Sequence, residues 1–327
     1  MGDRATLVAD ATESTGAHEA YLRGRYFWSQ RTIASLQSAI TEFQRAVELD
    51  PNYAEAWSGL ADSYLVLPSR LDFPDWAEVL SRAVPAAERA VALAPDLGMS
   101  HASLGYAYTL SARWQEAERE FRRAIQLNPG YATTHGWYAI LLICTGRADE
   151  AVVEATAGVA LDPVSPAVNS QLGLALKAAG RGEESIDQYR KASALQPTAS
   201  SPYLILGGLL LQAGEYDEAM EVALTHARLA GRDTVLVRGA VGAAVRYHET
   251  GEPQPFAVPE GMRMLGAGLL AYYALTGQRD VALQAFARLV RGPADWTAAL
   301  TDAMYTRDLL ADDPRYQALL EEAGITW

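Results

Sequence analysis

The sequence predicts an all-α fold, a right-handed superhelical solenoid of about seven antiparallel helix pairs. A leucine–X–proline phrase recurs along the chain, and its copies end at Pro51, Pro95, Pro129, Pro163 and Pro197. The last three prolines follow one another at intervals of 34 residues. Two amphipathic segments of helical length lie between consecutive prolines, and small residues recur in phase with them. Such a period is typical of stacked helical repeats, in which each repeat buries the apolar face of its neighbour.

This period resembles the tetratricopeptide repeat (TPR). That family has small residues at repeat positions 8, 20 and 27, large apolar residues at 7, 11 and 24, and proline at 32. Small residues at positions 8 and 20 let the two helices cross closely, and the large residues fill the space beside the crossing. The proline ends the second helix because the residue before it is pushed out of the α region. The repeat that begins at Gly98 matches with Leu104, Gly105, Tyr108, Ala117, Phe121, Ala124 and Pro129.

The other repeats match with departures. The repeat at Ala132 has Ala155 where a large residue is usual and Gly158 in place of alanine. The repeat at Ala54 carries an insertion at 67–76 before its second helix. Terminal repeats are expected to be atypical, because they must cap the open ends. We therefore expect a disordered tail at 1–16, a TPR array of about six repeats at 17–230, and a degenerate repeat with capping helices at 231–327. Single helices are expected from near Ala17, and over 33–49, 234–249, 294–305 and 314–323.

Both ends of the chain carry a second resemblance. The segments 19–28 and 39–54, and the ending 312–320, are similar to the C-terminal repeat region of bacterial regulators. In those proteins the repeats follow a winged-helix, cyclase or kinase domain. The resemblance implies a regulatory role in bacterial signalling or transcription.

Composition limits the partners and the compartment. The formal net charge of −13 argues against direct nucleic-acid binding, which relies on lysine and arginine. A single cysteine excludes an intramolecular disulfide and fits a reducing compartment. No apolar run reaches the roughly 18 residues that a membrane helix needs, and the first sixteen residues do not resemble a secretory signal. We expect a cytoplasmic protein that does not bind membranes.

Catalytic and cofactor motifs are not found, so the sequence predicts no enzyme, no cofactor and no metal site. The chain lacks a phosphate loop, His-Glu-x-x-His, Cys-x-x-Cys and Gly-x-Ser-x-Gly. His101 and His135 share position 4 of adjacent repeats, and we interpret them as packing residues rather than metal ligands, since zinc sites usually need three or four ligands. Cys144 has no neighbouring cation in the sequence that would activate it, so we expect a passive thiol.

The inward face of the first helices is the predicted binding surface. Positions 2, 5, 9 and 12 of each first helix share one face, which is small and apolar in the middle and aromatic at the amino-terminal end. Such a trough suits an amphipathic helix or an extended apolar segment of a partner, the chain's own tail, or a second copy in a homo-oligomer. The residues selected for this groove are Tyr21, Arg25, Trp28, Asp62, Tyr106, Thr109, Ile140, Ile143, Leu174, Lys177, Leu204 and Leu211.

Two further features bear on the partner. Repeat proteins that hold the acidic carboxyl end of chaperones use several lysines, arginine and asparagines on this face, whereas Arg25 and Lys177 are the cations available here. The insertion carries Phe73 and Trp76, which either contact a partner or pack on the helix that follows. The sequence thus favours a non-catalytic scaffold that binds a protein segment in a concave groove. The alternative is a small-ligand sensor, or the regulatory half of a transcription regulator.

Overall fold

The computed structural model describes residues 12–67, 76–199, 201–254, 273–291, 309–323 and 325. It confirms the all-α solenoid, because the described residues form helices in a repeat array and contain no strand. The chain divides into two compact units, 1–141 and 142–327. We call them the amino-terminal unit and the carboxy-terminal unit and describe each by itself.

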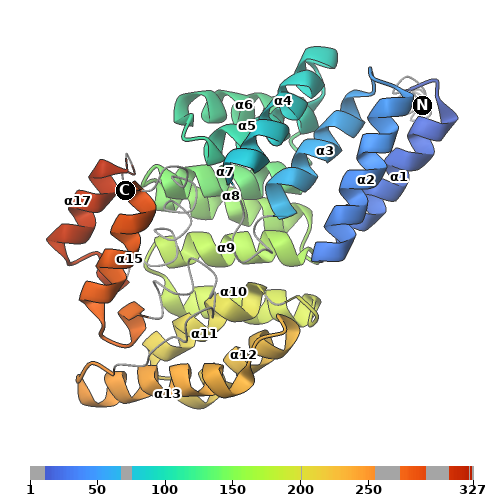
Figure 1. The fold of residues 1–327 in the computed structure, drawn as a ribbon. Coiled ribbons are helices and arrows are strands. Elements are labelled where there is room, and N and C mark those ends of the chain that lie inside the picture. Colours follow the sequence, from blue (N-terminus) through green and yellow to red (C-terminus); the bar gives the residue numbers. More distant parts are fainter. Residues whose placement is uncertain are drawn as a thin grey trace. The chain divides into compact units, whose positions relative to one another are not determined.

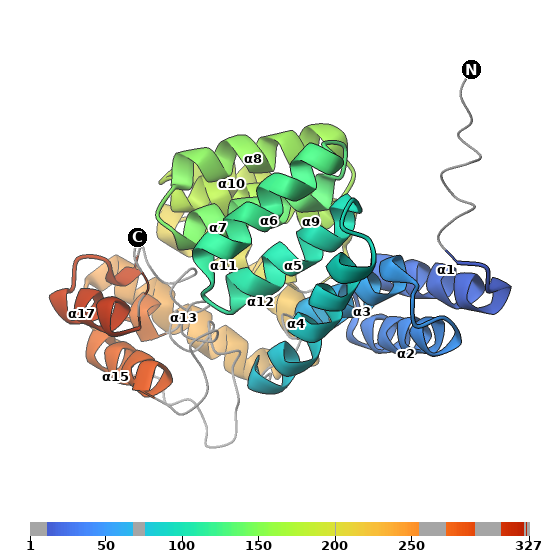
Figure 2. The ribbon, with the colours of Figure 1, turned by 90° about the horizontal axis from the view of Figure 1, so that it is seen from above.

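The amino-terminal unit is a series of helix pairs (Figure 1). Helices α1 and α2 lie side by side in both views (Figures 1 and 2), α3 packs on α4, and α5 packs on α6. First helices also pack on one another, α1 on α3 and α3 on α5. The helices are α1 (Thr15–Gln30), α2 (Ile33–Leu49), α3 (Ala54–Val66), α4 (Trp76–Leu93), α5 (Gly98–Leu110), α6 (Trp114–Leu127) and α7 (Ala132–Cys144), whose last turn enters the next unit.

The carboxy-terminal unit continues the pattern. Figure 1 shows its helices from α8 to α13 following one another in a stack, with α15 and α17 beside each other. Their bounds are α8 (Ala148–Leu161), α9 (Pro166–Ala178), α10 (Gly182–Leu195), α11 (Ser201–Ala213), α12 (Tyr216–Leu229), α13 (Thr234–Thr250), α15 (Arg279–Arg291) and α17 (Pro314–Glu322). The helices expected at 33–49, 234–249 and 314–323 are confirmed, whereas the one expected at 294–305 lies outside the described residues.

The small residue at position 8 is explained by a ring at position 24 of the same repeat. A Cβ atom added to the position-8 glycine would lie within 3.0 Å of that ring, so a larger residue would displace it. In one repeat the position-20 hydroxyl of Ser185 donates to the Gly173 carbonyl at 2.7 Å, which places positions 8 and 20 in contact as expected. The glycine–ring pairs are Gly24–Phe43 at 2.6 Å, Gly105–Phe121 at 3.0 Å and Gly173–Tyr189 at 2.8 Å.

Position 4 closes each repeat onto the one before it. In five consecutive repeats its side chain bonds the carbonyl of the proline six residues earlier. Tryptophan, histidine, asparagine and tyrosine all make this hydrogen bond. Position 4 therefore requires a side chain whose polar atom can reach the proline carbonyl, rather than one residue type. The pairs are Trp57–Pro51 (3.0 Å), His101–Pro95 (2.9 Å), His135–Pro129 (3.1 Å), Asn169–Pro163 (3.2 Å) and Tyr203–Pro197 (3.4 Å).

The helix ends follow from local chemistry. Helix α1 begins at Thr15, slightly earlier than expected, because the Ser14 hydroxyl accepts the Ala17 amide at 3.2 Å and caps it. The turn inside each repeat needs a left-handed residue. Gly146 supplies it with φ of 72°, whereas the equivalent turn has Ala112 with φ of 58°.

Candidate partner-binding surface

The predicted groove residues are less accessible than the sequence suggested. Five of them, which are half-buried, retain a surface that a partner can reach: Tyr21, Arg25, Tyr106, Ile140 and Leu204. The other seven are buried: Trp28, Asp62, Thr109, Ile143, Leu174, Lys177 and Leu211. Inward position alone therefore does not leave a side chain open.

Contacts between first helices explain the burial in the amino-terminal unit. The Ser103 hydroxyl of α5 donates to Asp62 Oδ1 of α3 at 2.6 Å. The hydroxyls of Ser58 and Ser100 lie 2.8 Å apart between the same two helices. Positions 5 and 9 of one repeat thus contact positions 3 and 6 of the next. This part of the inward face is polar and is used in packing.

Between the next two repeats, which begin at Gly98 and Ala132, aromatic rings occupy positions 9 and 6 and make the corresponding contact. Tyr106 at position 9 stacks on Trp137 at position 6 of the following repeat, with ring centroids 4.7 Å apart and planes inclined by 9°. Stacking leaves the Tyr106 ring half-buried. It therefore forms an aromatic surface of the kind that protein partners commonly contact.

At the amino-terminal end, four residues converge around the guanidinium of Arg25 and form a group of five with it: Tyr21, Arg25, Trp28, Asp62 and Tyr131. We call them the amino-terminal cluster. The Arg25 Cζ atom lies 5.1 Å from the centroid of the Trp28 ring, a cation–π distance. Tyr131, Tyr21 and Asp62 interact electrostatically with the same guanidinium. The cluster draws on α1, α3 and the residue before α7, so it spans the inward face of this unit.

Burial perturbs the charges of the cluster. Desolvation raises the pKa of Asp62 to about 6, although the bond from Ser103 and the charge of Arg25 oppose the rise. Desolvation also raises the pKa of Tyr21 to about 12. Burial would lower the pKa of Arg25, but Tyr131, Tyr21 and Asp62 together raise it above its ordinary value. Arg25 is therefore a permanent cation held beside a carboxyl group that titrates near pH 6.

Several buried polar atoms on this face lack a hydrogen-bond partner among the residues that the structure describes. They are Arg25 Nη1, Trp28 Nε1 and Tyr131 Oη in the cluster, and Thr134 Oγ1 nearby. The Tyr131 phenol is close enough to influence Arg25, yet the two make no bond of ordinary geometry. A buried polar group without a partner costs about 1–3 kcal/mol. Each of these atoms is buried, and a buried polar group without a partner calls for an explanation such as a bound water or ion or a functional role.

Thr134 has a separate, structural explanation. It occupies position 3, where Ser100 in the preceding repeat bonds Ser58 at position 5. The residue that corresponds to Ser58 is Ala102, which has no hydroxyl to offer. The Thr134 hydroxyl therefore occupies a position that contacts the preceding repeat but finds no hydroxyl there, and it is not part of the amino-terminal cluster.

The remaining sequence candidates have packing roles. His101 bonds Glu120 through Nδ1 at 2.6 Å and the Pro95 carbonyl through Nε2 at 2.9 Å, so both ring nitrogens are engaged. Burial raises the pKa of the Cys144 thiol. Trp76 begins α4 and is buried, as the packing alternative expects, whereas Phe73 lies outside the described residues. Within the described ranges no three or more His, Cys, Asp or Glu side chains are grouped so as to hold a metal ion.

Sequence analysis missed Tyr131, Ser100 and Ser103. Tyr131 directly precedes a repeat, outside the positions taken to face inward, and it interacts with Arg25 of α1. Ser100 and Ser103 occupy positions 3 and 6, which face the preceding repeat. Small polar residues at these positions, opposite Ser58 and Asp62, were the available signal.

Family models identify tetratricopeptide repeats in the chain. Residues 35–66 match a model described as TPR repeat, and residues 170–233 match one described as tetratricopeptide repeat. The chain is thus a TPR-containing protein in these two regions, and such repeats commonly mediate protein–protein interactions. No curated protein sequence matches it.

Solved structures share the fold at low identity. A human IFIT1 dimer with PPP-AAAA is 18% identical, with a TM-score of 0.55, over 88% of this chain and 68% of that one. The APC/C hetero-tetramer Cut9–Hcn1 is 12% identical, with a TM-score of 0.51, over 69% of this chain and 46% of the other. A thermophilic TPR protein from Thermus thermophilus is 22% identical, with a TM-score of 0.49, over 60% and 99%. These similarities concern the fold alone.

Among the residues that the structure describes, no helix has the length and apolar character needed to span a membrane.

Proposed function

We propose that this chain is a non-catalytic scaffold that binds a segment of a partner protein on the inward face of its first helices. The contact centres on the amino-terminal cluster and extends to the half-buried ring of Tyr106. The observation that carries the proposal is the set of cluster atoms without partners: Arg25 Nη1, Trp28 Nε1 and Tyr131 Oη. The three atoms are buried, so a partner segment removes the cost of leaving them unpaired by inserting an acceptor among them, directly or through a bridging water.

The polarity of the accessible residues indicates which kind of partner segment this surface binds. The sequence suggested a trough for an apolar helix, but Ile143, Leu174 and Leu211 are buried. What a partner can reach in the amino-terminal unit is mainly aromatic and cationic, from Tyr21, Arg25 and Tyr106, with Ile140 as the apolar residue among the predicted groove positions. Aromatic residues and arginine dominate the binding energy of many interfaces. We therefore favour a polar segment with hydrogen-bond acceptors over a purely apolar helix.

The test is a binding measurement with matched arginine variants. Proteins captured from the source cells by the immobilised chain are identified, purified and titrated against the wild type, Arg25→Ala and Arg119→Ala. Arg119 is exposed on α6 and serves as the control. We expect at least tenfold weaker binding for Arg25→Ala, since a truncated interface arginine often costs more than about 1.4 kcal/mol, and no change for Arg119→Ala. Equal binding by both variants would remove the cluster from the proposal.

A small-ligand sensor is the second candidate, and the size of the cluster favours it. Four side chains surround the Arg25 guanidinium, an arrangement that matches one polar head group better than a long peptide. The test is thermal unfolding in a low-molecular-mass extract of the source cells. A rise in Tm that Arg25→Ala abolishes supports the sensor, whereas no rise leaves the protein partner as the candidate.

We also propose that the scaffold serves a bacterial signalling or transcriptional system. The support is the resemblance of segments 19–28 and 312–320 to the repeat regions of such regulators. The first of these segments contains Arg25 and Trp28, so the resemblance includes part of the cluster. Deleting the gene should change the transcription of a defined set of genes, and the wild type but not Arg25→Ala should restore it. If the wild type and Arg25→Ala both restored transcription, the regulatory role would not depend on the amino-terminal cluster.

A further inference from the structure

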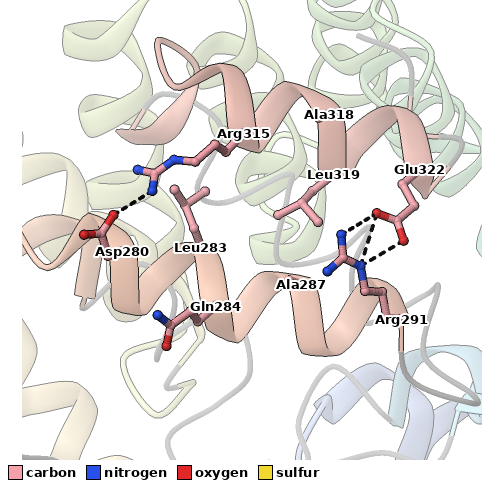
Figure 3. A pocket seen from close by; sticks show the side chains of 9 residues that line it. All are labelled: Asp280, Leu283, Gln284, Ala287, Arg291, Arg315, Ala318, Leu319 and Glu322. Carbon is pink, nitrogen blue, oxygen red and sulfur yellow. Dashed lines mark hydrogen bonds and ion pairs between the residues drawn. The ribbon is translucent and has the colours of Figure 1, made fainter.

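A groove lies between α15 and α17 in the carboxy-terminal unit (Figure 3). Its volume is about 590 Å³. Leu283 and Ala287 of α15 and Ala318 and Leu319 of α17 line its centre. The leucines are buried, whereas Ala318 is exposed, so the groove is shallow and open.

An ion pair closes each end of the groove. Asp280 Oδ1 accepts from Arg315 Nη1 at 2.7 Å at one end, and Glu322 Oε2 accepts from Arg291 Nη2 at 2.9 Å at the other (Figure 3). Since the first pair joins the starts of both helices and the second joins their ends, α15 and α17 run parallel. All four side chains remain substantially exposed. Asp313 also contacts Arg315, but its carboxylate is buried and caps α17, so it presents little charge outward.

The four exposed charges alternate in sign around the apolar centre. Along the groove, α15 presents Asp280 near its start and Arg291 at its end, whereas α17 presents a cation first and a carboxylate last. A two-fold rotation about an axis lying in the plane of this surface brings Arg315 of one copy to a carboxylate of the other and Glu322 to an arginine. This holds whether the axis runs along the helices or across them. The pattern is therefore complementary to itself, which a two-fold interface requires because both copies contribute the same patch.

We propose that the groove between α15 and α17 is a self-association surface whose occupant is a second copy of this chain. An apolar centre with a charged rim is the ordinary anatomy of an interface. The charges set the orientation of the two copies more than the strength of the contact. The surface is separate from the amino-terminal cluster, so the proposal does not depend on the partner-binding function.

Ala318 allows a direct test because it is exposed between the two ion pairs. Glutamate and arginine are good helix formers, so Ala318→Glu and Ala318→Arg should leave the fold intact. We take the two-fold axis to run across the helices, so that position 318 of one copy lies opposite position 318 of the other. Each variant then places like charges face to face, whereas a mixture of the two places opposite charges there. Sedimentation velocity of the full chain, alone and mixed, gives the oligomeric state, and circular dichroism verifies folding.

We expect the wild type to form dimers at about 0.1 mM, within reach of a weak specific interface. Each single variant should raise the dimer dissociation constant at least tenfold, and the equimolar mixture should recover the dimer. A wild type that stays monomeric at that concentration overturns the proposal. So does a dimer that both variants retain, or a loss that mixing does not reverse.

Discussion

The two units apply one repeat plan with different chemistry at the same positions. Both keep a ring at position 24, as in Phe121 of the amino-terminal unit and Tyr189 of the carboxy-terminal unit, each packed on a glycine at position 8. At position 9 they diverge, with Asp62 bonded to Ser103 in the first and a buried leucine, Leu174, in the second. Positions within a repeat carry the fold, whereas positions between first helices are free to vary. The polar variant, with its unpaired donors, is where we place partner binding.

Removing the position-24 ring, which both units share, should have the greatest effect on stability. Phe121→Ala and Tyr189→Ala should each cost about 3–5 kcal/mol of unfolding free energy, because a buried ring leaves a cavity. Urea unfolding followed by circular dichroism measures both, with Val153→Ala, at an exposed position, as the control. A cost below that of the control in either unit would show that its position-24 ring does not hold the repeat together.

The second prediction concerns Asp62, the buried carboxyl group that distinguishes the amino-terminal unit from the carboxy-terminal unit at position 9. A carboxyl group whose pKa is raised on folding binds its proton more tightly in the folded state, so its contribution is greatest at low pH and is lost as the pH rises through about 6. A rise from 3.8 to about 6 corresponds to about 3 kcal/mol. Asp62→Asn, whose amide oxygen still accepts from Ser103, should therefore raise the unfolding free energy at pH 7.5 by about 1–3 kcal/mol.

The comparison is made between pH 4 and 7.5. The wild type should lose stability over this range relative to Asp62→Asn, and the two should converge at the acid end. Glu48→Gln on α2 removes an exposed carboxylate and is the control. If Asp62→Asn retained the wild-type slope, Asp62 would not be the buried acid of this unit.

A smaller effect concerns the turn inside each repeat. Left-handed backbone is open to glycine but costs other residues about 1–2 kcal/mol. Gly146→Ala should therefore destabilise the chain by about 1 kcal/mol, and Ala112→Gly should stabilise it by up to about that amount. Thermal unfolding of the two variants and the double variant measures both signs. Stabilisation by Gly146→Ala would contradict the assigned turn geometry.

The smallest effect concerns His101. Burial would lower its pKa, but the bonds to Glu120 and the Pro95 carbonyl raise it above the ordinary value of 6.5. Its stabilisation is present below pH 6.5 and is lost as the pH rises through the raised value. His101→Asn places the residue found at 169 in the same position, keeps a donor for the proline carbonyl, and should flatten the loss of stability above pH 6.5. Glu120→Gln should act in the same way, and additive effects of the two would show that they are independent.

The sequence predicted the fold well because the repeat constrains positions within one helix pair. The phase of the prolines placed the helix pairs up to Pro197, and the glycine–ring pairs follow from positions 8 and 24. Which side chains stay open is decided between repeats, by how closely one first helix approaches the next. Leu174 and Lys177 face inward as expected yet are buried, and Tyr131 joins the cluster from outside the repeat positions. The distance between successive first helices depends on residues of two repeats at once, so no pattern within one repeat predicts it.

Site-specific photo-crosslinking in the source cells can show whether a partner contacts the inward face of the amino-terminal unit. A photoreactive phenylalanine derivative is placed at Tyr106, on the inward face, or at Val153, on the exposed face of α8. We predict partner adducts from position 106 that Arg25→Ala abolishes, and none from position 153. Adducts from position 153 alone, or adducts from 106 that persist in Arg25→Ala, would contradict the assignment of partner binding to the inward face of the amino-terminal unit.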